Sequence, residues 1–114
     1  LADDLEIVNG EAPTIVFTEN PSTTYRNAQA ILIDFQRLRN EINSFLYANG
    51  ILSLLVEGGA KTLSLNLDAI IWDESRVLTG NATFETGLNA PQVPFEPAHY
   101  EDHFGDKISY YYNV

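Results

Sequence analysis

The residues of this sequence best suited to chemistry form the run Glu57-Gly58-Gly59-Ala60-Lys61. An apolar run precedes the two glycines and a helical pattern follows them, so the glycines mark the passage from a strand into a helix. The first turn of a helix has unpaired backbone N–H groups and the positive end of the helix dipole, and phosphates bind there. Glycine also lets a phosphate approach the backbone closely. The run predicts a phosphate site, while a Gly-Gly pair is equally a feature of ordinary tight turns.

Two charged side chains beside these glycines leave alternatives open. Lys61 falls in the first turn of the expected helix, where its charge opposes the helix dipole by about 0.3–1 kcal/mol. A bound anion would remove that conflict, and a lysine directed into solvent would avoid it. Glu57 directly follows apolar residues, so its carboxylate needs a polar partner. That partner is either a ligand with amino or hydroxyl groups or the nearby backbone N–H groups.

The elements around this turn follow from hydrophobic patterning. Residues 51–56 are apolar except for one serine, which indicates a strand covered on both faces, as in a parallel sheet. Leucines four apart predict a short helix over residues 60–67. Upstream, residues 14–18 and 30–33 are short strand-like runs. A helix capped by Asp34 then ends at Asn49-Gly50, where glycine suits a left-handed position.

The C-terminal third of the sequence predicts antiparallel structure. Residues 76–79 favour a strand, residues 80–94 an irregular segment, and residues 96–103 and 107–114 a hairpin with a Gly-Asp turn. We expect surface histidines at positions 99 and 103 rather than a metal pair, and tyrosines 110–112 as sheet and interface residues. The order of elements predicts an α/β fold with a mostly parallel sheet and an antiparallel C-terminal hairpin.

Length, charge and residue usage limit the functions that this sequence can have. Its 114 residues suffice for one small domain, and a net charge of -10 with six scattered basic residues argues against nucleic acid or acidic membrane as partners. The absence of cysteine excludes disulfides, Cys-ligated zinc and a thiol nucleophile. We expect a cytoplasmic protein and no metal. Because the sequence starts at Leu1 rather than Met, we expect a piece of a longer gene product.

These motifs, taken together, resemble the reductase domain of the bifunctional riboflavin-biosynthesis deaminase/reductase (RibD), which has a dihydrofolate-reductase-like fold. The most specific part is the run from Leu54 to Ala60. Weaker matches follow in the expected order at Trp72-Asp73-Glu74, at Gly87-Leu88-Asn89-Ala90-Pro91 and at Gly105-Asp106-Lys107-Ile108, after an opening match at residues 13–18. The resemblance implies that residues 1–114 are the C-terminal portion of a single reductase domain.

The resemblance further implies an oxidoreductase that uses NADPH. The implied reaction reduces the ribose carbonyl of 5-amino-6-(5-phosphoribosylamino)uracil to the ribityl alcohol by hydride transfer. Glu57 is then expected at the substrate, and Thr18 at the cofactor. The remaining cofactor contacts are expected at Gly58, Gly59, Ala60, Lys61, Thr62, Leu63 and Ser64. No residue is assigned as the catalytic proton donor. Similar folds suggest a cis peptide between Gly58 and Gly59.

Two departures from that family limit the comparison. The family's zinc deaminase domain needs cysteines, which this sequence does not contain, and the strand and loops that open the reductase domain have no counterpart here. We therefore expect a fragment that is inactive alone and pairs with itself through sheet edges as a homo-oligomer. The alternatives are a non-catalytic oligomerisation module of a larger protein and a related reductase acting on a pterin-like substrate.

Overall fold

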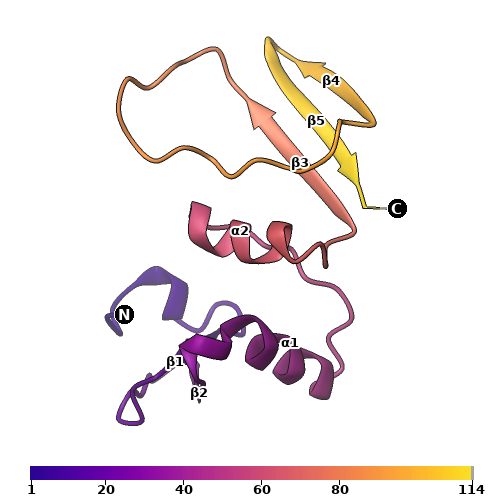
Figure 1. Cartoon of the computed structure of the whole chain (residues 1–114). Helices are drawn as coiled ribbons and strands as arrows, with labels where there is room; N and C mark the ends of the chain where they lie inside the picture. The colour runs from indigo at the N-terminus through magenta and orange to yellow at the C-terminus, as the bar shows by residue number, and fades with distance from the viewer. Residues whose placement is uncertain (114) are drawn as a thin grey trace. The chain divides into compact units, whose positions relative to one another are not determined.

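A computed structural model of the chain describes residues 1–113 and has a mixed α/β fold. It divides into two compact units, Leu1–Leu54 and Leu55–Val114, each with its own sheet (Figure 1). The described residues form two α-helices, one parallel pair of strands and one three-stranded antiparallel sheet. Neither helix is long and apolar enough to cross a membrane.

The first unit is built on two short parallel strands and one helix. After a 3-10 turn, Glu6–Val8, strand β1 (Ile15–Thr18) pairs in parallel with strand β2 (Gln29–Leu32). A second 3-10 turn, Phe35–Arg37, leads into helix α1 (Leu38–Ala48). The expected strands at residues 14–18 and 30–33 and the helix after them are confirmed.

A few apolar side chains hold this unit together. Val8 is fully buried and Ile33 nearly so, and the rings of Phe17 and Phe45 meet edge to face with centroids 5.5 Å apart. The contact between the two rings joins β1 to α1 and contributes about 0.5–1.5 kcal/mol beyond the area that it buries.

Both ends of the helical segment are closed by the chain itself. The carboxylate of Asp34 accepts a hydrogen bond of 2.9 Å from the backbone N–H of Gln36, as expected of an N-cap. At the other end Gly50 adopts a left-handed conformation, with φ of +74°. The N–H groups of Gly50 and Ile51 donate to the carbonyls of Tyr47 and Leu46, the two bonds of a Schellman motif.

The second unit contains helix α2 (Ala60–Asp68) and an antiparallel sheet of strands β3 (Glu74–Thr79), β4 (His99–His103) and β5 (Asp106–Tyr112). The strand order is β3-β5-β4, with β5 in the centre (Figure 1). The helix expected over residues 60–67, the strand near 76–79 and the C-terminal hairpin are confirmed, with Val114, the last residue of the predicted hairpin, outside the described residues. The irregular segment that follows β3 is confirmed as well.

The prediction of one mostly parallel sheet is wrong, because the strands divide between two sheets. The strand expected over residues 51–56 is also wrong, since that segment has no regular structure. Among the described residues, the backbone of residues 52–56 makes no hydrogen bond to another strand. A strand exists only through a paired partner, and a doubly covered strand also needs packing on both faces. Here Leu52 and Leu55 remain 91% and 82% exposed, so neither condition is met.

The connection between α2 and β3 carries backbone strain. Ile70 has φ of +53°, a left-handed conformation that costs a residue with a side chain about 1–2 kcal/mol. Asn113 holds the connection in place from the far end of β5. Its side-chain amide donates to the carbonyls of Ile70 at 3.0 Å and Trp72 at 2.8 Å, and its backbone N–H donates to Asp73 at 2.9 Å. These three hydrogen bonds hold the turn in place and so offset the cost of the left-handed conformation of Ile70.

The turn of the hairpin also differs from its prediction. His103 pairs with Asp106, so Phe104 and Gly105 are the two central residues, rather than Gly105 and Asp106. Both have positive φ, +50° and +91°, as in the type I′ turns whose twist suits a hairpin. Glycine tolerates this conformation, whereas phenylalanine adopts it only at a cost of about 1–2 kcal/mol. The twist of the two strands therefore prevails over the local preference of Phe104.

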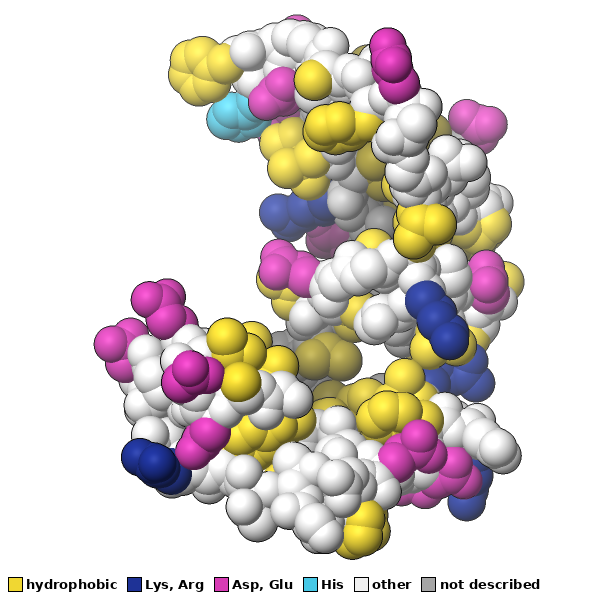
Figure 2. Space-filling view, turned by 90° about the vertical axis from the view of Figure 1, so that its left-hand side faces the viewer, with side chains coloured by type: hydrophobic (Ala, Val, Ile, Leu, Met, Phe, Trp, Pro, Cys, Tyr) yellow, Lys and Arg dark blue, Asp and Glu magenta, His cyan; other side chains and the backbone are white. Residues whose placement is uncertain are grey.

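The chain leaves an unusual amount of apolar surface uncovered. Many large hydrophobic side chains are exposed, among them Leu52, Leu88 and Phe104. Figure 2 shows hydrophobic side chains on the surface, interspersed with acidic ones.

Candidate functional site

The Gly58-Gly59 turn and the start of α2 form the main candidate site. Gly59 is the N-cap of α2, with φ of -72° and ψ of 165°, and no side chain caps the helix. The first bond of the helix runs from the N–H of Leu63 to the carbonyl of Gly59 at 3.2 Å. The preceding N–H groups, those of Ala60, Lys61 and Thr62, have no acceptor within the part of the chain that the structure describes. This end of the helix can therefore accept an anion.

The space in front of this turn is open. A Cβ atom placed on Gly59 would have no heavy atom within 4 Å beyond the adjacent residues, and one placed on Gly58 would meet only Thr62, at 3.8 Å. Gly58 has φ of +148°, a conformation that favours glycine. The expected cis peptide between the two glycines is wrong, because every described peptide bond is trans. A cis bond without proline costs several kcal/mol, and nothing here compensates for that cost.

The charged residues beside the glycines remain accessible. Glu57 and Lys61 are both exposed. No ion pair or hydrogen bond of either side chain occurs among residues 1–113. The alternative in which Glu57 accepts from nearby backbone N–H groups is thus not observed. Both side chains are available to a ligand with an anionic part near Lys61 and donor groups near Glu57.

The later residues of the predicted cofactor set lie along the first two turns of α2. Leu63 and Ser64 are half-buried, while Thr62 is exposed and its carbonyl accepts from the side-chain amide of Asn66 at 3.2 Å. Residues from Gly58 to Ser64 thus form one continuous segment around a helix start. Leu63 faces partly inward, so it supports the position of the helix.

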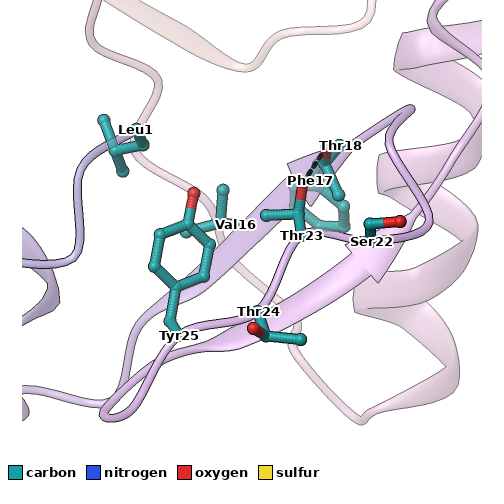
Figure 3. A pocket seen from close by; sticks show the side chains of 8 residues that line it. All are labelled: Leu1, Val16, Phe17, Thr18, Ser22, Thr23, Thr24 and Tyr25. Atoms are coloured by element: carbon teal, nitrogen blue, oxygen red, sulfur yellow. Dashed lines mark hydrogen bonds between the residues drawn. The ribbon is translucent and has the colours of Figure 1, made fainter.

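Thr18, the remaining predicted cofactor residue, lies in the first unit at the end of β1. Its hydroxyl accepts a hydrogen bond of 3.0 Å from the backbone N–H of Asn20 and lies 3.4 Å from the hydroxyl of Thr23. It lines an open hollow of about 500 Å³ (Figure 3). Val16 and Phe17 from β1 also line the hollow. Hydroxyl groups beside apolar side chains suit a neutral ligand that both donates and accepts hydrogen bonds.

The sequence alone did not single out the other residues of this hollow. They are Leu1, Ser22, Thr24 and Tyr25 together with Thr23. The available signal was the run Ser22-Thr23-Thr24-Tyr25, four consecutive hydroxyl side chains directly after Pro21 in the loop that follows the first strand. In Figure 3 the Tyr25 hydroxyl and the linked pair of Thr18 and Thr23 lie in different parts of the hollow.

The two histidines lie where the sequence placed them, on the surface of the hairpin. Both belong to β4 and are exposed. The ring of His99 stacks on Tyr110, with centroids 4.5 Å apart and an angle of 12° between the rings. Over residues 1–113, no three His, Cys, Asp or Glu side chains gather in a group that could hold a metal ion.

Tyr110 lies at the centre of a cross-strand row, between Arg76 and His99. The Arg76 guanidinium lies 5.2 Å from the centre of the Tyr110 ring, and the Tyr110 hydroxyl donates to Glu101 at 3.1 Å. Desolvation and this hydrogen bond raise the pKa of Tyr110 above its ordinary value. The pKa of Arg76 is raised by its hydrogen bond and charge interaction with Glu74. Ring stacking, the hydrogen bond of Tyr110 and the ion pair of Arg76 hold the row together, so we interpret it as a structural feature of the sheet.

Comparison with known proteins adds no relative to this description of fold and site. No protein-family model matches the chain, and neither the curated proteins nor the solved structures contain a significant match. The fold class, mixed α/β, rests on the structure itself, and function has to be argued from the sites.

Proposed function

We propose that the chain carries the cofactor-phosphate turn of an NADPH-dependent reductase of the riboflavin-pathway deaminase/reductase type, with a dihydrofolate-reductase-like fold. The observation that carries this proposal is the uncapped start of α2 at Gly59, with three unpaired N–H groups. Natural helices usually begin with a Ser, Thr, Asp or Asn cap. Here no cap is present, and a bound phosphate would accept hydrogen bonds from the unpaired N–H groups instead.

The residues around the turn fit a dinucleotide phosphate. The missing side chain of Gly59 leaves room for close approach, and the exposed ammonium group of Lys61 adds a positive charge beside the N–H groups. Since Lys61 opposes the helix dipole in the free chain, an anion would relieve an unfavourable interaction as well as form new ones. The fit extends over Gly58, Gly59, Ala60, Lys61 and Thr62.

The roles of the chain's own groups follow from this placement. The N–H groups of α2 and Lys61 would fix the phosphates, and the carboxylate of Glu57, one residue before the glycines, would accept hydrogen bonds from amino or hydroxyl groups of the substrate. Thr18 would be a further cofactor contact. When bound, the nicotinamide supplies the hydride for reduction of a carbonyl group. The protein's contribution is to bind and orient the two reactants.

The proposed substrate is 5-amino-6-(5-phosphoribosylamino)uracil, with a pterin-like carbonyl compound as the alternative. The first is favoured by the resemblance of residues 54–60 to the riboflavin-pathway enzyme. Protection of the chain by each compound against thermal unfolding, with NADPH present, separates the two. Binding of the pterin-like compound alone would retain the reductase class and replace the substrate.

Fluorescence titration with NADPH tests the proposal. Gly59→Val places a branched side chain in the open space before the helix without a clash inside the chain, because its backbone angles suit any residue. We expect binding to weaken at least about tenfold, which is roughly 1.4 kcal/mol. Gly80→Ala is the control, since it removes a glycine from a loop outside the site, where a Cβ would have an ordinary contact with Asp106. Equal affinity in all three proteins would refute the phosphate assignment.

A second candidate is a non-catalytic module that assembles as a homo-oligomer. It is favoured by the two outer edges of the antiparallel sheet, since β3 and β4 pair on one side only within the described strands. Unpaired edges are templates for pairing with another chain. Sedimentation and NADPH titration of wild type separate the candidates together: the first candidate expects NADPH binding that Gly59→Val weakens, and the second expects an oligomer that binds no NADPH and that Gly59→Val leaves intact.

A further inference from the structure

The tip of the β4–β5 hairpin combines two unfavourable features in one residue. Phe104 is 103% exposed, and its ring has a neighbour in the ring of His103, with centroids 6.0 Å apart. It also has φ of +50° in a turn position where asparagine or glycine would be comfortable. The left-handed conformation lowers the stability of the free chain, and the exposed ring buries little apolar surface to offset that cost. Strain of this kind is often found at binding sites.

Two contacts fix the backbone of the turn that carries this ring. His103 and Asp106 close the turn as a cross-strand pair, and the carboxylate of Asp102 accepts from the N–H of Gly105 at 3.2 Å. A second exposed aromatic ring, Tyr100, lies further along β4 and is 66% exposed, with the Lys107 ammonium 5.3 Å from its centre. Aromatic side chains on a rigid support are the residues that contribute most to protein–protein binding.

The charges around the tip specify the partner. Three carboxylates, those of Glu101, Asp102 and Asp106, and one ammonium, that of Lys107, lie within three residues of Phe104, so the tip has an excess of negative charge, and the whole chain has a net charge of -10. A second copy would bring the same acidic residues and the same net charge to the contact, which like-charge repulsion opposes. An anionic lipid surface would be repelled in the same way. A basic protein surface would be attracted.

We propose that Phe104 is an anchor that inserts into an apolar pocket, rimmed by Lys or Arg, on a different protein. The ring supplies the buried apolar contact, and the carboxylates beside it pair with the basic rim. Preorganisation of the turn by Asp102 reduces the ordering cost on binding. A binding role accounts for the presence of phenylalanine at a position where it lowers the stability of the chain.

The test compares two exposed phenylalanines in the full chain. Phe104→Asn replaces the anchor with a residue that favours the turn, so this variant should be more resistant to unfolding than wild type. Phe84→Asn removes a ring that is 89% exposed in the irregular segment after β3 and serves as the matched control. Each protein is immobilised and exposed to soluble extract of the source organism at low salt. Any retained protein is purified and titrated against all three chains.

The expected result is one basic protein that binds wild type and Phe84→Asn alike, binds Phe104→Asn at least about tenfold more weakly, and dissociates as salt is raised. Equal binding by Phe104→Asn, or retention of no protein at all, overturns the proposal. Two further measurements can also overturn it. Sedimentation of a dimer that Phe104→Asn abolishes would assign the ring to a second copy. Binding to neutral phosphatidylcholine vesicles that Phe104→Asn abolishes would assign it to a membrane.

Discussion

The end of α1 and the start of α2 are both built on glycine, and they use it in opposite ways. At the end of α1, Gly50 turns the chain so that the helix carbonyls find partners within the chain. At the start of α2, Gly59 provides no cap, and three N–H groups stay unpaired across the described residues. The first glycine completes a structure, whereas the second leaves it incomplete in a place that a ligand can reach. The difference separates a glycine needed for folding from one suited to binding.

The largest effect is expected from Gly50→Val, which breaks the closed end. A β-branched residue at φ of +74° should lower the free energy of unfolding by about 2 kcal/mol. The change is measured by urea unfolding followed by circular dichroism. NADPH affinity should stay the same under conditions where the variant is folded.

Gly59→Asp is the matched substitution at the open end. Its carboxylate would cap α2 and raise the free energy of unfolding by a few tenths of a kcal/mol, roughly the gain of replacing an N-cap glycine. The same negative charge would compete with phosphate and weaken NADPH binding. Should Gly59→Asp instead destabilise the chain as much as Gly50→Val does, the distinction between the two glycines would be lost.

Ile70→Gly sharpens the comparison at a third helix end. The C-terminus of α2 has the same left-handed turn as α1, yet an isoleucine occupies it. Glycine there should raise the free energy of unfolding by about 0.5–1 kcal/mol, since relief of strain exceeds the added entropy of the unfolded chain. Fluorescence of Trp72, the one tryptophan, follows the unfolding of this unit.

Ile71→Gly is the control for that measurement, because the two isoleucines are equally exposed, at 51% and 49%, and only Ile70 has positive φ. It should destabilise the chain by about 1 kcal/mol. A loss of stability in Ile70→Gly as large as that in Ile71→Gly would contradict the strained turn.

The smallest effect is expected for the hydroxyl of Tyr110, whose hydrogen-bond partner lies within the same sheet. Tyr110 is desolvated and donates to Glu101, so its pKa is raised. Because the neutral phenol is the favoured form, this contribution to stability is fully present below about pH 10, the ordinary pKa, and is lost as pH rises through the raised one. Titration of tyrosinate absorbance should show that Glu101→Gln moves the pKa of Tyr110 downward, with Tyr110→Phe identifying its signal. An unchanged pKa in Glu101→Gln would mean that Glu101 does not contribute to the raised pKa of Tyr110.

Elements with local signals were predictable from the sequence. The cap at Asp34, the glycine at position 50 and the period of α2 are properties of neighbouring residues, and all three are confirmed. The strand over residues 51–56 failed because pairing depends on partners that the sequence does not identify. The turns at Ile70 and Phe104 could not be foreseen, since both residue types disfavour positive φ; the distant Asn113 holds the first, and the strand register of the hairpin imposes the second. The helix start at Gly59 was predictable as geometry, and its ligand remains a proposal.

The uncovered leucines after α1 also bear on how the protein behaves at high concentration. Residues 51–56 form six consecutive positions with no charge and no proline, the composition that favours intermolecular strand stacking. Glu57 and the glycines after it interrupt this run, and the charge of -10 keeps the chains apart in neutral solution. As the pH falls toward the isoelectric point near 4.3, that repulsion vanishes while the leucines stay exposed. Storage well above pH 4.3, where the net negative charge is kept, should therefore limit association through this segment.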